Sequence, residues 1–143
     1  MADIGNDPRI DPRIKALMGS IPVSIQEDVT SREQLLEEAN SPESIAAWER
    51  SAALMGLLDN EQVAPSAGLQ TTTHEFTSAP DGNTVKVQFI RPESPEPLPC
   101  VYYIHGGGMQ IMSCFDGIYR AWGRIIAQQG VAVAMVDFRN CLV

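Results

Sequence analysis

Hydrophobic residues follow two different spacings along the chain, and the change falls near residue 65. Before it, apolar side chains recur every three or four positions, which is the spacing of one face of a helix. Three helices are expected there, each beginning at a residue whose side chain can cap a first turn: Asp11, Ser31 and Ser41. The sequence therefore predicts an N-terminal helical segment over residues 1–65.

After residue 65, apolar positions alternate with polar ones, as they do along a half-buried strand. Two strands are predicted, over 69–78 and 84–91, and the Asp81-Gly82 pair between them is a turn signal. The two strands should therefore pair as an antiparallel hairpin. In the second strand, three side chains are expected to form one apolar face: Val85, Val87 and Phe89.

Two continuous apolar runs, over 100–104 and 131–136, indicate strands buried on both faces of a parallel sheet. A helix with inward-facing apolar residues is predicted between them, over 118–129. Strand, helix and strand in this order form one right-handed crossover. Four prolines within 92–99 make the preceding connection an exposed loop. The part over 66–143 is therefore predicted to be a core of the α/β class.

Composition and charge exclude several classes of function. The 143 residues suffice for one ordinary domain, and a net charge of −8 argues against nucleic acid or an anionic membrane as the partner. No apolar window approaches the ~20 residues of a membrane span. Three cysteines without a C-x-x-C pair indicate reduced thiols, so a cytoplasmic location is expected. The two histidines stand in no ligand-spaced cluster, and neither a metal nor a cofactor is expected.

The candidate chemistry lies where the run from Cys100 to Ile104 stops at His105 and the three glycines 106–108. Because glycine has no Cβ, the backbone there can adopt conformations that other residues rarely reach. Its N–H groups can then come within hydrogen-bonding distance of a bound atom. An oxyanion hole in acyl transfer uses such donors to hold a developing negative charge. The spacing therefore indicates a catalytic loop rather than a plain turn.

The same residues carry a resemblance to a known family. His105-Gly106-Gly107-Gly108 after a strand, followed by a helix and a strand that closes in Asp137-Phe138-Arg139-Asn140, resembles the hormone-sensitive-lipase-like branch of the α/β-hydrolases, in particular bacterial carboxylesterases of the brefeldin A esterase type. The resemblance covers residues 69–143 in good register and the N-terminal part more loosely. It implies the N-terminal half of an α/β-hydrolase sheet, preceded by a helical cap segment over 1–65. Those helices could instead simply cover one face of the sheet.

The resemblance implies a serine carboxylesterase that hydrolyses short- or medium-chain esters. The G-x-S-x-G nucleophile motif of the family does not occur in the sequence. The Ser-Asp-His triad is therefore expected on a complementary C-terminal segment of the same enzyme. Without that segment, the strand over 100–104 would be an unpaired apolar edge. This segment and a small ester are the expected partners, and homo-oligomerisation is left open.

Two other functions compete with ester hydrolysis. The first is ligand binding without turnover, as in the receptors that resemble the same branch. The second is a phosphate cradle, which ranks lower because neither glycine-rich phosphate-binding motif is present.

Each residue of the glycine loop is assigned an expected role. Gly107 and Gly108 are expected to donate their amides to the oxyanion, and Gly106 to allow the bend. His105 is expected to brace the loop rather than to act as the base, because the resemblance places the base histidine near the C-terminus.

Four residues after the glycines are expected to line the substrate pocket: Met109, Met112, Asp116 and Tyr119. Either methionine could instead fill a gap in the core. Asp137 and Arg139 are expected to make structural ion pairs or hydrogen bonds. The thiols of Cys114 and Cys141 are poor candidates for a nucleophile, since no histidine and carboxylate pair is arranged for them.

Overall fold

The computed structural model describes residues 6–18 and 28–141, which form four helices and four strands. In chain order these are α1 (Pro12–Met18), α2 (Arg32–Ala39), α3 (Pro42–Gly56), β1 (Leu69–Thr77), β2 (Thr84–Pro92), β3 (Cys100–Ile104), α4 (Gly117–Ala127) and β4 (Ala132–Asp137). The chain divides into two compact units, Met1–Leu35 and Leu36–Val143. The second unit holds α3, α4 and the whole sheet, and it carries the candidate site.

The three predicted helix starts are confirmed. At each start, a side-chain oxygen accepts a hydrogen bond of 2.8–3.2 Å from an amide two or three residues further on: Asp11 from Arg13, Ser31 from Gln34, and Ser41 from Ser44. These bonds satisfy amides that have no partner inside the helix. In α3 no side chain is buried, although its apolar residues follow helical spacing.

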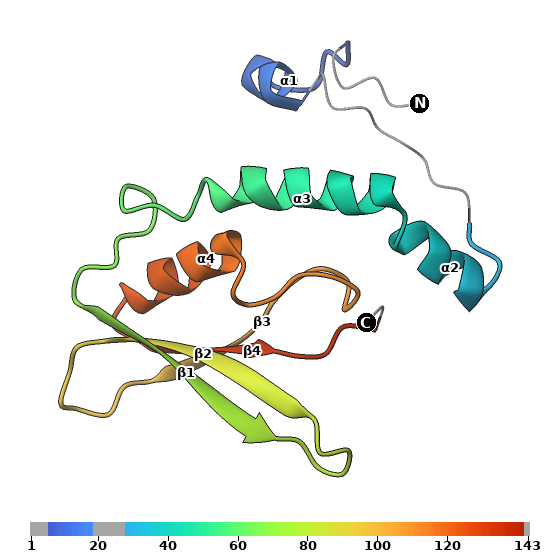
Figure 1. Cartoon of the computed structure of the whole chain (residues 1–143). Helices are drawn as coiled ribbons and strands as arrows, with labels where there is room; N and C mark the ends of the chain where they lie inside the picture. Colours follow the sequence, from blue (N-terminus) through green and yellow to red (C-terminus); the bar gives the residue numbers. More distant parts are fainter. Residues whose placement is uncertain (1–5, 19–27, 142–143) are drawn as a thin grey trace. The chain divides into compact units, whose positions relative to one another are not determined.

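The four strands form one sheet in the order β1-β2-β4-β3, with α4 against it (Figure 1). β1 and β2 pair as the predicted antiparallel hairpin, and β2 also pairs antiparallel with β4. β3 and β4 are parallel and are joined through α4, which confirms the predicted crossover. Parallel pairing brings the carboxyl ends of β3 and β4 to the same edge of the sheet.

The three residues of the predicted apolar face of β2 are not the most buried residues of that strand. Ile90 and Gln88 are buried, whereas the side chains of Val85, Val87 and Phe89 are only half-buried. The reason is α4, which packs on the side of Ile90. The alternating pattern alone cannot tell which face of a sheet a distant helix will cover.

Close packing of α4 on the sheet depends on Gly123. A Cβ at this position would collide with the sulfur of Met135 and would lie 2.9 Å from the Cδ1 of Ile90. The absence of a side chain therefore lets the helix axis approach the strands. The buried core around this contact consists of Ile90, Cys114, Ala127, Val133 and Met135.

β3 lies at the edge of the sheet, and four of its five residues are exposed. Tyr102 and Ile104 expose 62% and 57% of their surface. The prediction of a strand buried on both faces therefore holds for β4 but not for β3, in which only Tyr103 is even half-buried. The expected unpaired apolar edge is present.

Within the described residues, the helices are all too short or too polar to cross a membrane. The same part of the chain contains no group of three or more side chains that could hold a metal ion.

Candidate active site

The glycine loop connects the carboxyl end of β3 to the start of α4 and spans residues 105–116. The segment that follows β4 lies beside it, because the two parallel strands end at the same edge. The amide of Cys141 donates to the carbonyl of Met109 at 2.9 Å, and the Asn140 side chain donates to the carbonyl of Met112 at 2.8 Å. Two hydrogen bonds from the segment after β4 therefore hold the loop that follows β3.

Gly107 and Gly108 adopt backbone conformations that favour glycine, with φ of +110° and +63°. The carbonyl of Gly107 accepts hydrogen bonds from the amides of Gln110 and Ile111, at 3.0 and 3.2 Å, which folds the loop back on itself. A Cβ at Gly107 would collide with the carbonyl oxygen of Ile111, whereas one at Gly108 would meet nothing within 4 Å. Gly107 is thus required by contact as well as by conformation.

The amides of Gly107 and Gly108 donate no hydrogen bond within residues 6–18 and 28–141. Backbone amides in a folded protein are nearly always paired with protein, water or ligand. These two consecutive amides, which follow the end of a parallel strand, therefore have no partner among the described residues.

His105 is buried, with 4% of its surface exposed, and lies at the start of the loop. Its Nδ1 is 2.7 Å from the carbonyl of Gly106, so this nitrogen carries the proton in the neutral ring. Its ring stacks on Phe138, with centroids 4.2 Å apart and planes 7° apart. These contacts are of the kind that a bracing imidazole needs, and they leave Nε2 without a partner among the described residues.

The four predicted pocket residues lie on or next to the loop. Met109 is 61% exposed, with a φ of +61°. Met112 is half-buried, with its sulfur 3.1 Å from the hydroxyl of Tyr119. Asp116 contributes to the fold of the loop, because its carboxylate accepts a hydrogen bond from the Ser113 amide at 3.0 Å.

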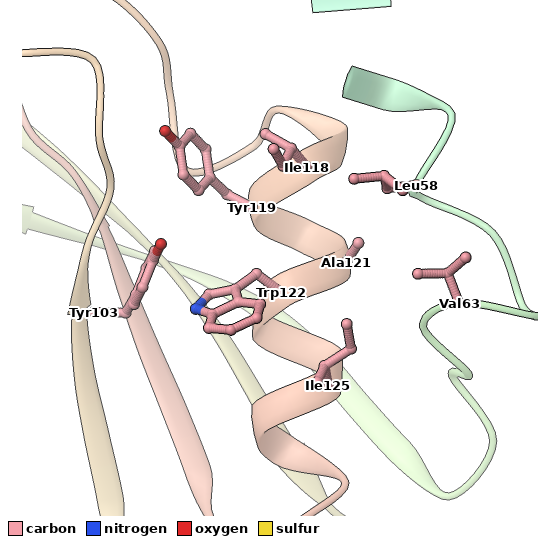
Figure 2. A pocket seen from close by; sticks show the side chains of 8 residues that line it. All are labelled: Leu58, Val63, Tyr103, Ile118, Tyr119, Ala121, Trp122 and Ile125. Carbon is pink, nitrogen blue, oxygen red and sulfur yellow. The ribbon is translucent and has the colours of Figure 1, made fainter. Parts of the chain in front are cut away.

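A cavity of about 300 Å³ lies between α4, β3 and the segment after α3 (Figure 2). It is lined by apolar and aromatic side chains, among them Leu58, Val63, Tyr103 and Trp122. Of the predicted pocket residues, Tyr119 lines it and the other three do not. Trp122, which lies on the predicted helix over 118–129 and lines the cavity, is 47% exposed.

Arg139 makes an ion pair with Asp81 at 2.9 Å, between the segment after β4 and the β1–β2 turn. This ion pair agrees with a structural role for Arg139, whose acidic partner is Asp81 of the hairpin and not Asp137.

The buried thiol of Cys114 is unsuited to catalysis, because burial raises its pKa to about 11 and keeps it protonated near pH 7.

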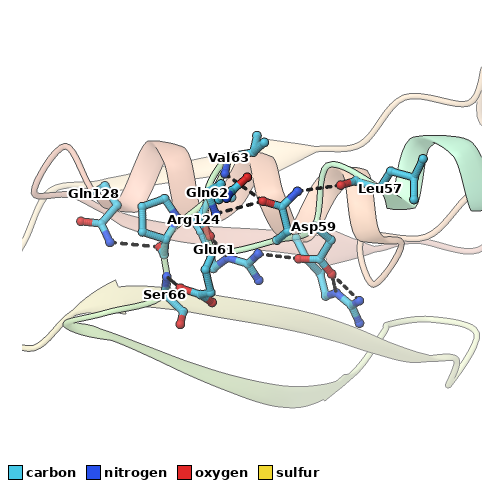
Figure 3. Close-up of polar contacts among 12 residues, drawn as sticks. Leu57, Asp59, Glu61, Gln62, Val63, Ser66, Arg124 and Gln128 are labelled. Atoms are coloured by element: carbon cyan, nitrogen blue, oxygen red, sulfur yellow. Dashed lines mark hydrogen bonds and ion pairs between the residues drawn. The ribbon is translucent and has the colours of Figure 1, made fainter.

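Sequence reasoning missed a row of contacts between α4 and the segment that leads from α3 to β1 (Figure 3). Arg120 and Arg124 both donate to the carboxylate of Asp59. Further along the helix, Arg124 donates to the carbonyl of Ala64 at 2.8 Å, and Gln128 donates to the carbonyls of Pro65 and Ala67 at 3.1 Å. The available signal was the spacing of Arg120, Arg124 and Gln128, which places three long donors on one helix face.

The chain is similar in structure to solved esterases. None of the known family models matches the chain. The structure of esterase Est22 superposes with a TM-score of 0.90 at 58% identity, over 98% of this chain and 41% of that one. Brefeldin A esterase, described as a bacterial homologue of human hormone-sensitive lipase, gives a TM-score of 0.65 at 28% identity, over 97% of this chain and 39% of that one.

A curated protein, gut esterase 1 of Caenorhabditis elegans, is 35% identical over 65 residues, which are 46% of this chain and 12% of that protein. The chain thus spans about two fifths of the length of the solved esterases that it matches. Its four-stranded mixed sheet with the β3-α4-β4 crossover is the N-terminal portion of their fold. The chain belongs to the hormone-sensitive-lipase-like branch of the α/β-hydrolases, of which it represents the N-terminal part.

Proposed function

We propose that this chain supplies the oxyanion loop of a serine carboxylesterase that hydrolyses short- or medium-chain carboxylic esters. The observation that carries the proposal is that the amides of Gly107 and Gly108, at the carboxyl end of a parallel strand, donate to no other described residue. The esterase names of the related structures support the same reaction class.

The residues of the chain would act on the carbonyl group of the ester. A serine from outside the described residues attacks the carbonyl carbon, and its proton passes to a histidine base. The carbonyl oxygen becomes an anion, which the amides of Gly107 and Gly108 stabilise. The alcohol leaves with that proton, and water then releases the acid from the acyl-serine. His105 holds the Gly106 carbonyl throughout, so the donors stay in place.

The nucleophile and the rest of the triad are proposed to lie on a complementary C-terminal segment of the same enzyme. Solved relatives are more than twice as long as this chain. The open edge of β3 offers unpaired backbone groups and the apolar side chains of Tyr102 and Ile104. A further parallel strand would pair with this backbone and would bring a strand-end residue next to the glycine loop.

The N-terminal helical segment, residues 1–65, is proposed to serve as part of a cap over the substrate. Support comes from α3, whose end lies against the start of α4: a Cβ at Gly117 would be 3.1 Å from the Cα of Gly56. The row of contacts from Asp59 to Gln128 holds the segment between α3 and β1 against α4.

We also propose a reducing compartment such as the cytoplasm, in keeping with the free thiols of Cys100, Cys114 and Cys141.

Hydrolysis of p-nitrophenyl acetate and p-nitrophenyl butyrate by the complete protein tests the proposal. We expect turnover with burst kinetics as the acyl-enzyme accumulates. Saturable binding of these esters without release of p-nitrophenol would contradict it and would favour the receptor-like function. No binding and no turnover would contradict both.

A further inference from the structure

We propose that Tyr119 is a positioning residue for the glycine loop: its hydroxyl joins Gly106 and Met112, the two ends of the segment that carries Gly107 and Gly108. The inference rests on the proposed function of that segment as an oxyanion hole. It assigns Tyr119 a role other than lining the substrate pocket.

The hydroxyl of Tyr119 makes one contact at each end of this segment. It donates to the sulfur of Met112 at 3.1 Å. At the other end, an ideal Cβ on Gly106 would lie only 2.9 Å from the same oxygen, so the backbone passes directly against it. Burial raises the pKa of Tyr119, while a hydrogen bond from the Gly106 backbone lowers it. The hydroxyl group thus donates to Met112 at one end of the segment and lies against the Gly106 backbone at the other.

The segment between these ends needs such a restraint. Met109 and Met112 both have positive φ, +61° and +78°, which residues other than glycine rarely adopt. A conformation of this kind persists only when surrounding contacts hold it. Met112 is held at its carbonyl by Asn140, at 2.8 Å, and at its sulfur by Tyr119.

The ring of Tyr119 is fixed by its neighbours, so its hydroxyl has a defined position. Its centroid lies 5.5 Å from that of His105 and 6.1 Å from that of Tyr103. The amide of Tyr119 donates to the carbonyl of Asp116 in the first turn of α4. Figure 2 shows the hydroxyl turned away from Trp122 and Ile125, so the cavity receives the ring and not the polar group.

The substitution Tyr119→Phe removes the hydroxyl and keeps the ring. In the complete protein, we expect kcat for p-nitrophenyl acetate to fall about three- to tenfold, the effect of losing a neutral hydrogen bond, with KM unchanged. Tyr103→Phe is the matched control, because it removes the same atom from a neighbouring tyrosine whose hydroxyl makes no hydrogen bond with the described residues of the loop. Met112→Leu should lower kcat similarly, and the double variant should be no worse than either single variant.

A second measurement does not depend on activity. Backbone ¹⁵N relaxation should show lower order parameters for Gly107 and Gly108 in Tyr119→Phe, towards the value of about 0.6 typical of flexible segments. The inference is overturned if these order parameters stay at their wild-type values, or if Tyr119→Phe raises KM alone, which would place the hydroxyl on the substrate. Failure of the wild-type protein to hydrolyse esters contradicts the proposed function instead, and the relaxation data still decide the role of Tyr119.

Discussion

At the scale of single residues, Gly107 and Gly108 differ in what a side chain would meet. Both have positive φ, but a Cβ at Gly107 would enter the space of the Ile111 carbonyl, while one at Gly108 would enter open space. The same chemical change, addition of one methyl group, therefore has different consequences one residue apart. This difference separates the conformational requirement for glycine from the steric one.

Gly107→Ala should lower kcat of the complete protein by about 10²–10³, the cost of losing one oxyanion donor, because the loop must move to admit the methyl group. Gly108→Ala is the matched control and should cost only the left-handed strain of about 1–2 kcal/mol, mostly in stability. The measurement is kcat for p-nitrophenyl acetate together with the melting temperature of each variant. Equal kcat losses in both variants would argue against the steric account.

The special backbone of these glycines could be predicted from the sequence, because three consecutive glycines after an apolar run favour a conformation that other residues rarely adopt. The contact between Tyr119 and Gly106 could not. It depends on how the first turn of α4 rotates against the loop, and Tyr119 lies thirteen residues beyond Gly106 in the chain. The sequence pattern predicted that Tyr119 lies near the site, but it predicted no hydrogen-bond partner for the hydroxyl group.

At the scale of elements, α4 connects the sheet to the segment after α3. Its inner face carries Gly123, which allows close packing on Ile90 and Met135. Another face carries Arg120 and Arg124, which hold Asp59. Burial raises the pKa of Asp59, but the hydrogen bonds from the two guanidinium groups outweigh it and hold the pKa below the ordinary value of 3.8.

Asp59→Asn should lower the free energy of unfolding by about 1–3 kcal/mol at pH 7, since two guanidinium groups lose their charged partner. The folded-state pKa of Asp59 is depressed, so the wild-type contribution is complete above the ordinary value of 3.8 and is lost as the pH falls through the folded value. The difference between variant and wild type should therefore shrink in acid. Urea unfolding at pH 7 and at pH 3 measures both effects.

Glu75→Gln is the matched control for this prediction, because its pair with Lys86 is exposed and 3.7 Å long. Exposed pairs of this kind contribute little to stability. A loss in Glu75→Gln as large as that in Asp59→Asn, or a loss in Asp59→Asn that grows in acid, would contradict the assignment.

Most elements could be predicted, because helix caps and the Asp81-Gly82 turn are local signals. The orientation of β2 could not, since the side of the sheet that meets α4 is set by packing between distant residues. The ion pairs of Asp59 with α4 join residues about sixty positions apart, so they could not be predicted either. The spacing of the two arginines on one helix face was the only sequence signal for them.

At the scale of the whole molecule, the sheet ends in an open apolar edge. β3 pairs with β4 on one side and has no neighbouring strand on the other within the described residues, and the side chains of Tyr102 and Ile104 on its face are exposed. Such an edge promotes pairing with another strand. The same surface that a complementary segment would cover should therefore drive self-association of the isolated chain.

The isolated chain of 15.6 kDa should sediment as a mixture heavier than a monomer, and Ile104→Lys should shift it towards the monomer, because a charge on an edge strand opposes pairing. Thr73→Lys, on the polar edge strand β1, is the control and should change little. Sedimentation velocity distinguishes these results. A monomeric wild-type chain would show that the edge of β3 does not need a partner.

The central claim concerns two backbone nitrogens, and a crystal structure of the complete protein with its serine trapped by a p-nitrophenyl phosphonate tests it most directly. The account predicts that one phosphonyl oxygen lies about 2.7–3.1 Å from the amide nitrogens of both Gly107 and Gly108. An adduct whose oxygen is held by other donors, with these two amides turned towards the protein interior, would contradict it.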